Sequence, residues 1–133
     1  MKVLIADNDR VYLNLLAEVL TLHSYEVVTA LDGEEALDLL KNQDFDLVIS
    51  DISMPKINGM NLHRYVRQDP KLKHIPFAWN SGYRELRDVV EPEDSAIDFN
   101  LDKGIPVRNL LYFVSHVEAT QKRQHKETGI LAA

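Results

Sequence analysis

The sequence contains no cysteine, which excludes disulfide bonds and thiolate metal ligands. A secretory signal would place a positively charged segment and then an apolar stretch after Met1, and neither is found there. No apolar run approaches the roughly 20 residues that a membrane span requires. We therefore expect a soluble, cytoplasmic protein that does not contact a membrane.

Positive charge is also scarce. The 133 residues include 15 Lys and Arg against 21 Asp and Glu, a formal net charge of −6, and no basic stripe appears before Gln121. This balance argues against direct binding of nucleic acid. The five histidines are scattered along the chain, so they indicate no metal cluster, and we expect each of them at the surface.

The length of the chain bounds its organisation. A chain of 133 residues with 45% hydrophobic content suits one domain with a single buried core. We expect that domain to cover residues 1–120. Residues 121–133 then form a charged C-terminal helix end or tail.

Short runs of Val, Leu and Ile alternate with stretches in which apolar residues recur at helical spacing. This alternation is typical of right-handed crossovers and of a parallel sheet covered by helices on both faces. Asp32 and Glu35 form a capping-box pattern, and Pro106 can begin the last helix at its first turn. The predicted strands are 2–6, 26–30, 47–50, 77–80 and 97–101, and the predicted helices are 11–22, 32–40, 59–67, 83–90 and 106–120.

Polar side chains follow four of these strands. Asp7 and Asp51 come directly after apolar strands, and ligands bind at the carboxyl edge of such sheets. At about 4 Å and an effective dielectric constant of about 20, two like charges repel by about 4 kcal/mol, so we expect a divalent cation or a shared proton between them. Ser81 and Lys103 follow the fourth and fifth strands. Two acids, a hydroxyl and an ammonium at one edge suit phosphoryl chemistry.

The chain resembles the receiver domain of two-component response regulators over about residues 2–120. The similarity rests on four segments in order: 3–9 (VLIADND), 50–55 (SDISMP) with Gly59, Ser81-Gly82, and Lys103. Each segment alone is weak evidence for the resemblance, whereas the order and spacing of all four are specific to the family. The resemblance implies a doubly wound, flavodoxin-like (βα)5 sandwich whose five parallel strands have the order 2-1-3-4-5.

The same resemblance implies roles for individual residues. Asp51 corresponds to the aspartate that takes a phosphoryl group from a kinase phosphohistidine. Ser81 corresponds to the switch hydroxyl, and Lys103 to the lysine that pairs with the phosphoryl group. The implied partners are a sensor histidine kinase or phosphotransfer protein and an unknown downstream protein, with a homodimer as a further option. The implied Mg²⁺ ligands are Asp7, Asn8, Asp51 and the backbone carbonyl of Ser53.

Several positions depart from the family pattern. Asn8 replaces the second of two adjacent acids, which should weaken a cation site. Gly104 stands in place of a proline, so we expect a trans peptide bond after Lys103. Asn100 lies where a switching aromatic residue is common. Asn80 interrupts an otherwise apolar strand and needs hydrogen-bond partners if it is buried. Tyr83 could shield the phosphoryl group from water.

Three functions remain open at this point. The first is a phosphoacceptor switch that acts through a partner protein, with at most Mg²⁺-dependent self-phosphorylation and self-dephosphorylation as enzymatic activity. The second is a phosphorylation-independent interaction module, which the departures favour. The third is a hydrolase with Asp51 as nucleophile, although Ser53 stands where a dehalogenase-like enzyme would carry a second aspartate. Asp9 is predicted to cap a helix, and Trp79 is predicted to lie in the core.

Overall fold

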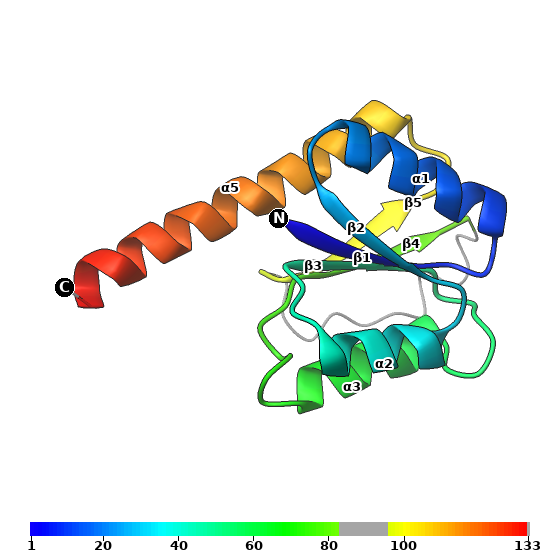
Figure 1. Cartoon of the computed structure of the whole chain (residues 1–133), viewed down its shortest axis with the longest axis horizontal. Helices are drawn as coiled ribbons and strands as arrows, with labels where there is room; N and C mark the ends of the chain where they lie inside the picture. The colour runs from blue at the N-terminus through cyan, green and yellow to red at the C-terminus, as the bar shows by residue number, and fades with distance from the viewer. Residues whose placement is uncertain (83–95, 133) are drawn as a thin grey trace.

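The computed structural model describes residues 1–82 and 96–132. Strands and helices alternate from the N-terminus to residue 81 (Figure 1). The predicted helix 83–90, together with Tyr83, lies outside the described residues. The strands are β1 (Lys2–Ala6), β2 (Glu26–Ala30), β3 (Leu47–Ser50), β4 (Phe77–Ser81) and β5 (Asp98–Asp102), and the helices are α1 (Arg10–Leu22), α2 (Gly33–Asn42), α3 (Gly59–Gln68) and α5 (Val107–Ala132).

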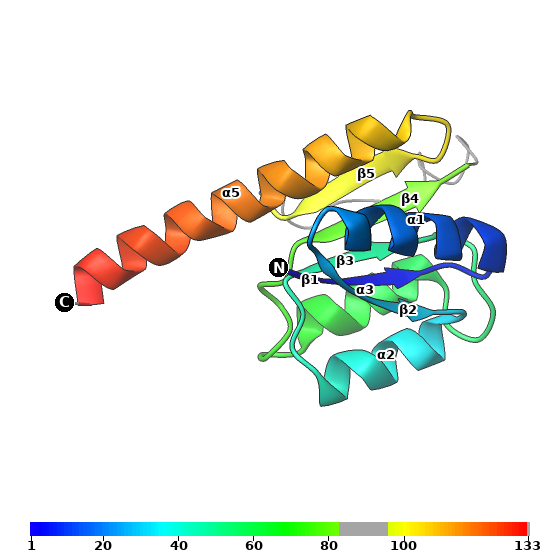
Figure 2. The ribbon, with the colours of Figure 1, turned by 45° about the horizontal axis from the view of Figure 1, so that its top comes forward.

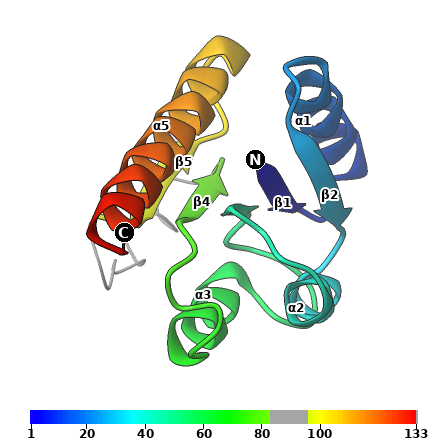
Figure 3. The same ribbon diagram turned by 60° about the vertical axis from the view of Figure 1, so that its left-hand side comes forward.

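The five strands form one parallel sheet in the order β2-β1-β3-β4-β5, which confirms the predicted fold. Helices α1 and α5 cover one face, and α2 and α3 cover the other (Figures 2 and 3). Alternate residues of each strand enter the two cores. Val3, Ile5 and Ile49 pack with α1 and α5, whereas Leu4 and Val48 belong to the core beneath α2 and α3.

Side-chain caps define where the first two helices begin. Asp9 caps α1, as predicted, because its Oδ1 accepts hydrogen bonds from the backbone N–H groups of Val11 and Tyr12. Asp32 caps α2 by accepting from the Glu35 N–H at 2.8 Å, and the Glu35 carboxylate accepts from the Leu31 N–H. These caps place the start of α1 and α2 beside the carboxyl edge of the sheet.

Helix α5 continues beyond the sheet to Ala132, so its last turns project away from the domain (Figures 1 and 2). Leu110, Val114 and Val117 are buried and attach its first half to the core shared with α1. The Gln121 side-chain amide donates to the Asp46 carbonyl at 2.7 Å. Residues 121–132 are therefore a helix end in this structure.

The expectation that every histidine lies at the surface was wrong for His63. His63 is only 4% exposed, and its ring centroid lies 4.4 Å from that of Trp79. His63 Nε2 lies 2.9 Å from an oxygen of Asp98, and Arg67 donates to the same oxygen at 2.5 Å. Trp79 itself is 1% exposed and donates to the Gly59 carbonyl, which confirms its predicted place in the core.

Candidate functional site

Three side chains that follow different strands meet at the carboxyl edge of the sheet. Ala6 pairs with Ser50 in the register of β1 and β3, so Asp7 and Asp51 leave the sheet at the same level. The Lys103 ammonium, from the end of β5, lies 2.6 Å from Asp7 Oδ2 and 3.1 Å from Asp51 Oδ2. Both acids are largely buried, at 2% and 8% exposure. One cation therefore bridges the two carboxylates that the sequence predicts to be neighbours.

The remaining carboxylate oxygens are held by the backbone. Asp7 Oδ1 accepts a hydrogen bond from the Asp9 N–H at 2.9 Å. Asp51 Oδ1 accepts from the Ile52 N–H at 2.7 Å and from the Ser53 N–H at 3.4 Å. Each acid therefore presents its other oxygen, Oδ2, to the Lys103 ammonium.

The structure places the other predicted site residues at the same edge. Ser81 is buried at the end of β4, and its carbonyl accepts from the Lys103 N–H at 3.1 Å. Asn8 is exposed and directly follows Asp7. Ser53 is also exposed and lies two residues after Asp51. Asn100 is exposed in the middle of β5. The described peptide bonds include no cis bond, so the Lys103-Gly104 bond is trans as predicted.

Sequence reasoning missed one residue of this site. Tyr12, in the first turn of α1, places its ring centroid 4.8 Å from the Lys103 ammonium. Its hydroxyl accepts a hydrogen bond from the buried Asn80 side-chain amide at 2.7 Å. The partner expected for Asn80 is therefore Tyr12. The available signal was a tyrosine three residues after the predicted cap Asp9, which places it beside the strand ends.

Burial dominates the electrostatics of the acid pair. Desolvation raises the pKa of Asp7, although hydrogen bonds from Lys103 and the Asp9 N–H oppose the rise. For Lys103, burial alone would lower the pKa, but the hydrogen bonds and negative charges of Asp7 and Asp51 prevail and raise it. Asp7 does not show the lowered pKa usual for a paired acid because it is more deeply buried than its lysine partner.

The raised pKa of Asp7 predicts an unusual effect on stability. Because the folded state binds the Asp7 proton more tightly than the unfolded state, the ionised carboxylate lowers the free energy of unfolding above the folded pKa. Asp7→Asn is therefore expected to be more stable than wild type at neutral pH in EDTA. The difference should shrink as the pH falls towards the ordinary value of 3.8. Urea unfolding followed by Trp79 fluorescence measures both quantities.

Asp32→Asn is the matched control for that experiment. Asparagine caps a helix as well as aspartate does, so the substitution removes only the charge. Hydrogen bonding from the Glu35 N–H and the nearby Lys56 hold the pKa of Asp32 below its ordinary value. That carboxylate contributes stability above its unfolded pKa, and the contribution is lost as the pH falls. Asp32→Asn should thus be less stable at neutral pH, and equal effects of both substitutions would contradict the argument.

The donors at this edge fit a magnesium ion. Mg²⁺ prefers oxygen ligands. Asp7 and Asp51 each direct one carboxylate oxygen at the Lys103 ammonium, so two oxygens already converge on one positive charge. No group of three or more His, Cys, Asp or Glu that could hold a metal occurs among residues 1–82 and 96–132. A metal ion here would thus depend on two carboxylates, with neutral oxygens from the Asn8 amide, the Ser53 carbonyl and water completing its shell.

Gly59 fixes the loop that carries Asp51. A Cβ atom on Gly59 would collide with the backbone carbonyl of Asp51, and the Gly59 N–H donates to the Ile52 carbonyl at 2.8 Å. We expect Gly59→Ala to lower the free energy of unfolding by about 1–3 kcal/mol, the usual cost of overpacking. Gly82→Ala is the control in urea unfolding, because its Cβ would meet nothing closer than 3.8 Å. Equal stability of the two variants would contradict the close approach.

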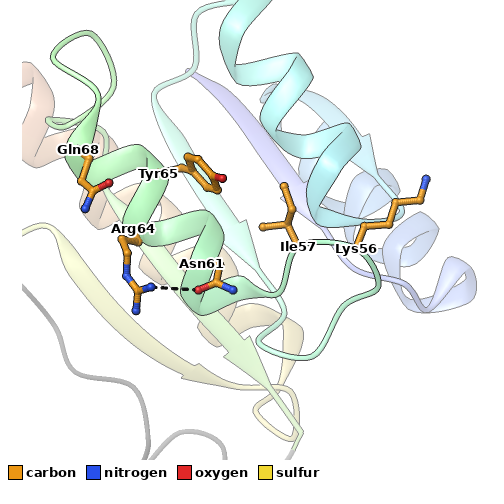
Figure 4. A pocket seen from close by; sticks show the side chains of 6 residues that line it. All are labelled: Lys56, Ile57, Asn61, Arg64, Tyr65 and Gln68. Carbon is orange, nitrogen blue, oxygen red and sulfur yellow. Dashed lines mark hydrogen bonds between the residues drawn. The ribbon is translucent and has the colours of Figure 1, made fainter.

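A separate hollow lies on the outer face of α3 (Figure 4). Neither the two acids nor Lys103 lines it. Its volume is about 400 Å³. Arg64 donates to the Asn61 side chain within it, and Tyr65 is 53% exposed. The hollow thus takes no part in the arrangement at the strand ends. Its lining is Lys56, Ile57, Asn61, Arg64, Tyr65 and Gln68.

Known proteins share this sequence pattern. The family model for the response regulator receiver domain matches residues 3–115. The transcriptional regulatory protein CpxR of Escherichia coli K12 is 36% identical over 124 residues, which cover 93% of this chain and 50% of CpxR. The polar-differentiation response regulator DivK of Brucella ovis is 30% identical over 74 residues, which cover 56% of this chain and 60% of DivK. This chain therefore spans half the length of CpxR, and its match with DivK spans 60% of that protein.

Solved structures share the fold. The response regulator TrrA of Thermotoga maritima, determined in complex with Mg²⁺ and BeF, is 30% identical with a TM-score of 0.76. The similarity covers 87% of this chain and 97% of TrrA.

In the described part of the chain, no helix combines the length and the apolar character needed to cross a membrane.

Proposed function

This chain belongs to the family of response regulator receiver domains, and on that premise we propose that it is a phosphoacceptor switch of two-component signalling. In this proposal Asp51 takes a phosphoryl group from a histidine kinase or a phosphotransfer protein. The observation that carries the proposal is the single ammonium of Lys103 that bridges Asp7 and Asp51. Such an arrangement suits a carboxylate that must gain and lose a phosphoryl group.

The geometry favours one oxygen of Asp51 as the acceptor. Oδ1 is engaged by backbone N–H groups, whereas Oδ2 faces the Lys103 ammonium. In the proposed step, Oδ2 bonds to phosphorus as the phosphorus–nitrogen bond of a phosphohistidine breaks, and the imidazole leaves with the electron pair and gains a proton. Lys103 then pairs with the phosphoryl oxygens, and the Ser81 hydroxyl donates to one of them.

Asp7, Asn8, Asp51 and the Ser53 carbonyl would hold Mg²⁺ in this proposal. When bound, the ion supplies positive charge against the phosphoryl oxygens. The complex of TrrA with Mg²⁺ and BeF supports such a site in a relative. We further propose a receiver domain of residues 1–120 with a charged helical continuation, a cytoplasmic location, and signalling through an unidentified downstream protein or a second copy of the chain.

Phosphorylation-independent binding is the second candidate. Asn8, Asn100 and Gly104 depart from the family pattern in the acidic pair, the switch position and the loop after the lysine. In addition, the Lys103 ammonium already offsets the charge of Asp7 and Asp51. A protein that retained the receiver fold only for contacts with partners would tolerate all of these features.

An amide NMR titration with Mg²⁺, repeated with beryllofluoride, separates the two candidates. For a phosphoacceptor we expect saturable shifts at Asp7, Asn8 and Asp51 with Mg²⁺. With the phosphate mimic, further shifts should reach Ser81 and Lys103. No response at millimolar Mg²⁺, with or without the mimic, would reject the switch and leave the interaction module as the function.

A further inference from the structure

Within residues 1–82 and 96–132, the Lys103 ammonium contacts two acids and one aromatic ring. An ammonium group carries three N–H donors. Two directions lead to Asp7 Oδ2 at 2.6 Å and to Asp51 Oδ2 at 3.1 Å. The third neighbour is the ring of Tyr12, whose centroid lies 4.8 Å away, within the range of a cation–π contact.

The Tyr12 ring is itself held in place. The side-chain amide of Asn80 donates to the Tyr12 hydroxyl at 2.7 Å, and Asn80 is 3% exposed in β4. A buried amide is costly without a partner, so this hydrogen bond accounts for the presence of Asn80 in β4. The sheet thus anchors Asn80, and Asn80 anchors the ring.

The Lys103 ammonium lies beside a cavity, so a neighbouring side chain is needed to hold it in place. A cavity of about 150 Å³ opens between α1 and the start of α5, and Tyr12, Asn80 and Lys103 lie on its wall. The lysine side chain is flexible, and loss of the ring would enlarge this cavity. Without Tyr12 the ammonium could therefore rotate away from the acid pair.

We propose that Tyr12 is a positioning residue that holds the Lys103 ammonium between Asp7 and Asp51, with Asn80 holding Tyr12. The contact stands independently of the proposed function, whereas its effect on phosphoryl transfer rests on that function. Tyr12 does not touch the reacting atoms. It acts by keeping the cation where the charge of a phosphoryl group on Asp51 would develop.

The first test is NMR of the Lys103 side chain, which requires no phosphorylation. A methylene group over a ring face resonates upfield, so the Lys103 ε-methylene signals should lie upfield of those of an exposed lysine such as Lys71. They should move to the ordinary position in Tyr12→Leu and stay partly upfield in Tyr12→Phe, which keeps the ring but loses the hydrogen bond from Asn80. Tyr65→Leu, on the outer face of α3, is the control and should leave them unchanged. Lys103 signals at the ordinary position in wild type would overturn the proposal.

The second test is the rate at which Asp51 is labelled by a small-molecule phosphodonor. A partly desolvated cation–π contact corresponds to about tenfold in rate, so Tyr12→Leu should be labelled about ten times more slowly than wild type. Tyr12→Phe should recover only part of that loss, because the ring that meets the ammonium is kept but is no longer held by Asn80. Unchanged labelling of Tyr12→Leu would overturn the positioning role even if the NMR contact were present.

The two tests distinguish failure of the proposed function from failure of the Tyr12 contact. If wild type takes no label, the proposed function fails, and the Lys103 signals still decide whether Tyr12 holds the ammonium. Asn80→Ser provides a further variant that leaves the Tyr12 ring in the protein. Upfield Lys103 signals that weaken in this variant support the anchoring by Asn80, and signals identical to wild type reject it.

Discussion

Asp51→Asn is expected to lose all labelling by a small-molecule phosphodonor in the presence of Mg²⁺. The substitution keeps the size of the side chain, and its amide oxygen can still accept from the Ile52 N–H in place of Asp51 Oδ1. The amide nitrogen that replaces Oδ2 is not a nucleophile for phosphorus and repels the Lys103 ammonium. The measurement is incorporation of phosphorus label or the mass increase of the intact protein.

Asp9→Asn is the control for the acceptor. Asp9 is a neighbouring acid at the same edge of the sheet, but its Oδ1 caps α1. Asparagine performs this role equally well, so the variant should fold and take label at the wild-type rate. Label that persists in Asp51→Asn would place the acceptor on another residue and refute the proposed function.

The position of the acid pair could be predicted from the sequence because it follows from chain register. Asp7 and Asp51 each end an apolar strand, and in a parallel sheet such ends meet at one edge. Lys103 was predictable for the same reason, since it follows β5. Local patterns were also sufficient for the caps Asp9 and Asp32, which depend on residues only three positions away.

Contacts between distant elements were not predictable in this way. Tyr12 reaches Lys103 from α1, and its position three residues after the cap Asp9 places it near the strand ends without revealing that it meets Lys103. His63 follows apolar Leu62 on α3, so its spacing is compatible with the buried face or with the exposed face of the helix. What keeps it inside is Asp98, 35 residues later in the chain. A single sequence does not reveal such a pair.

The two ends of the sheet therefore carry different kinds of buried charge. At the carboxyl edge, two acids share one lysine, and the excess negative charge suits a site that binds a cation or a phosphoryl group. At the amino end of β5, one acid, Asp98, meets both Arg67 and His63. That second cluster lies in the core against Trp79 and links α3 to β5. Its expected contribution is to stability.

Asp98→Ala is expected to lower the free energy of unfolding by about 3–5 kcal/mol, because it leaves a buried charge without its partner. The Asp98 side chain is fully buried, and that of Arg67 is only 4% exposed. The Arg67 guanidinium also donates to the carbonyls of Ile75 and Ile97, so it joins the loop after α3 to the start of β5. Its Nε has no hydrogen-bond partner among the residues that the structure describes, which increases its dependence on Asp98.

Removing both charges separates a buried ion pair from a simple packing defect. In Arg67→Met combined with Asp98→Ala, no isolated charge remains, so the double variant should be more stable than Asp98→Ala alone. Urea unfolding followed by Trp79 fluorescence suits this comparison, since the Trp79 ring contacts His63. Lys71→Ala, which breaks an exposed pair with Asp44 at 3.7 Å, should cost less than about 1 kcal/mol. Additive losses in the double variant would show that Asp98 stabilises the fold through packing and not through its charge.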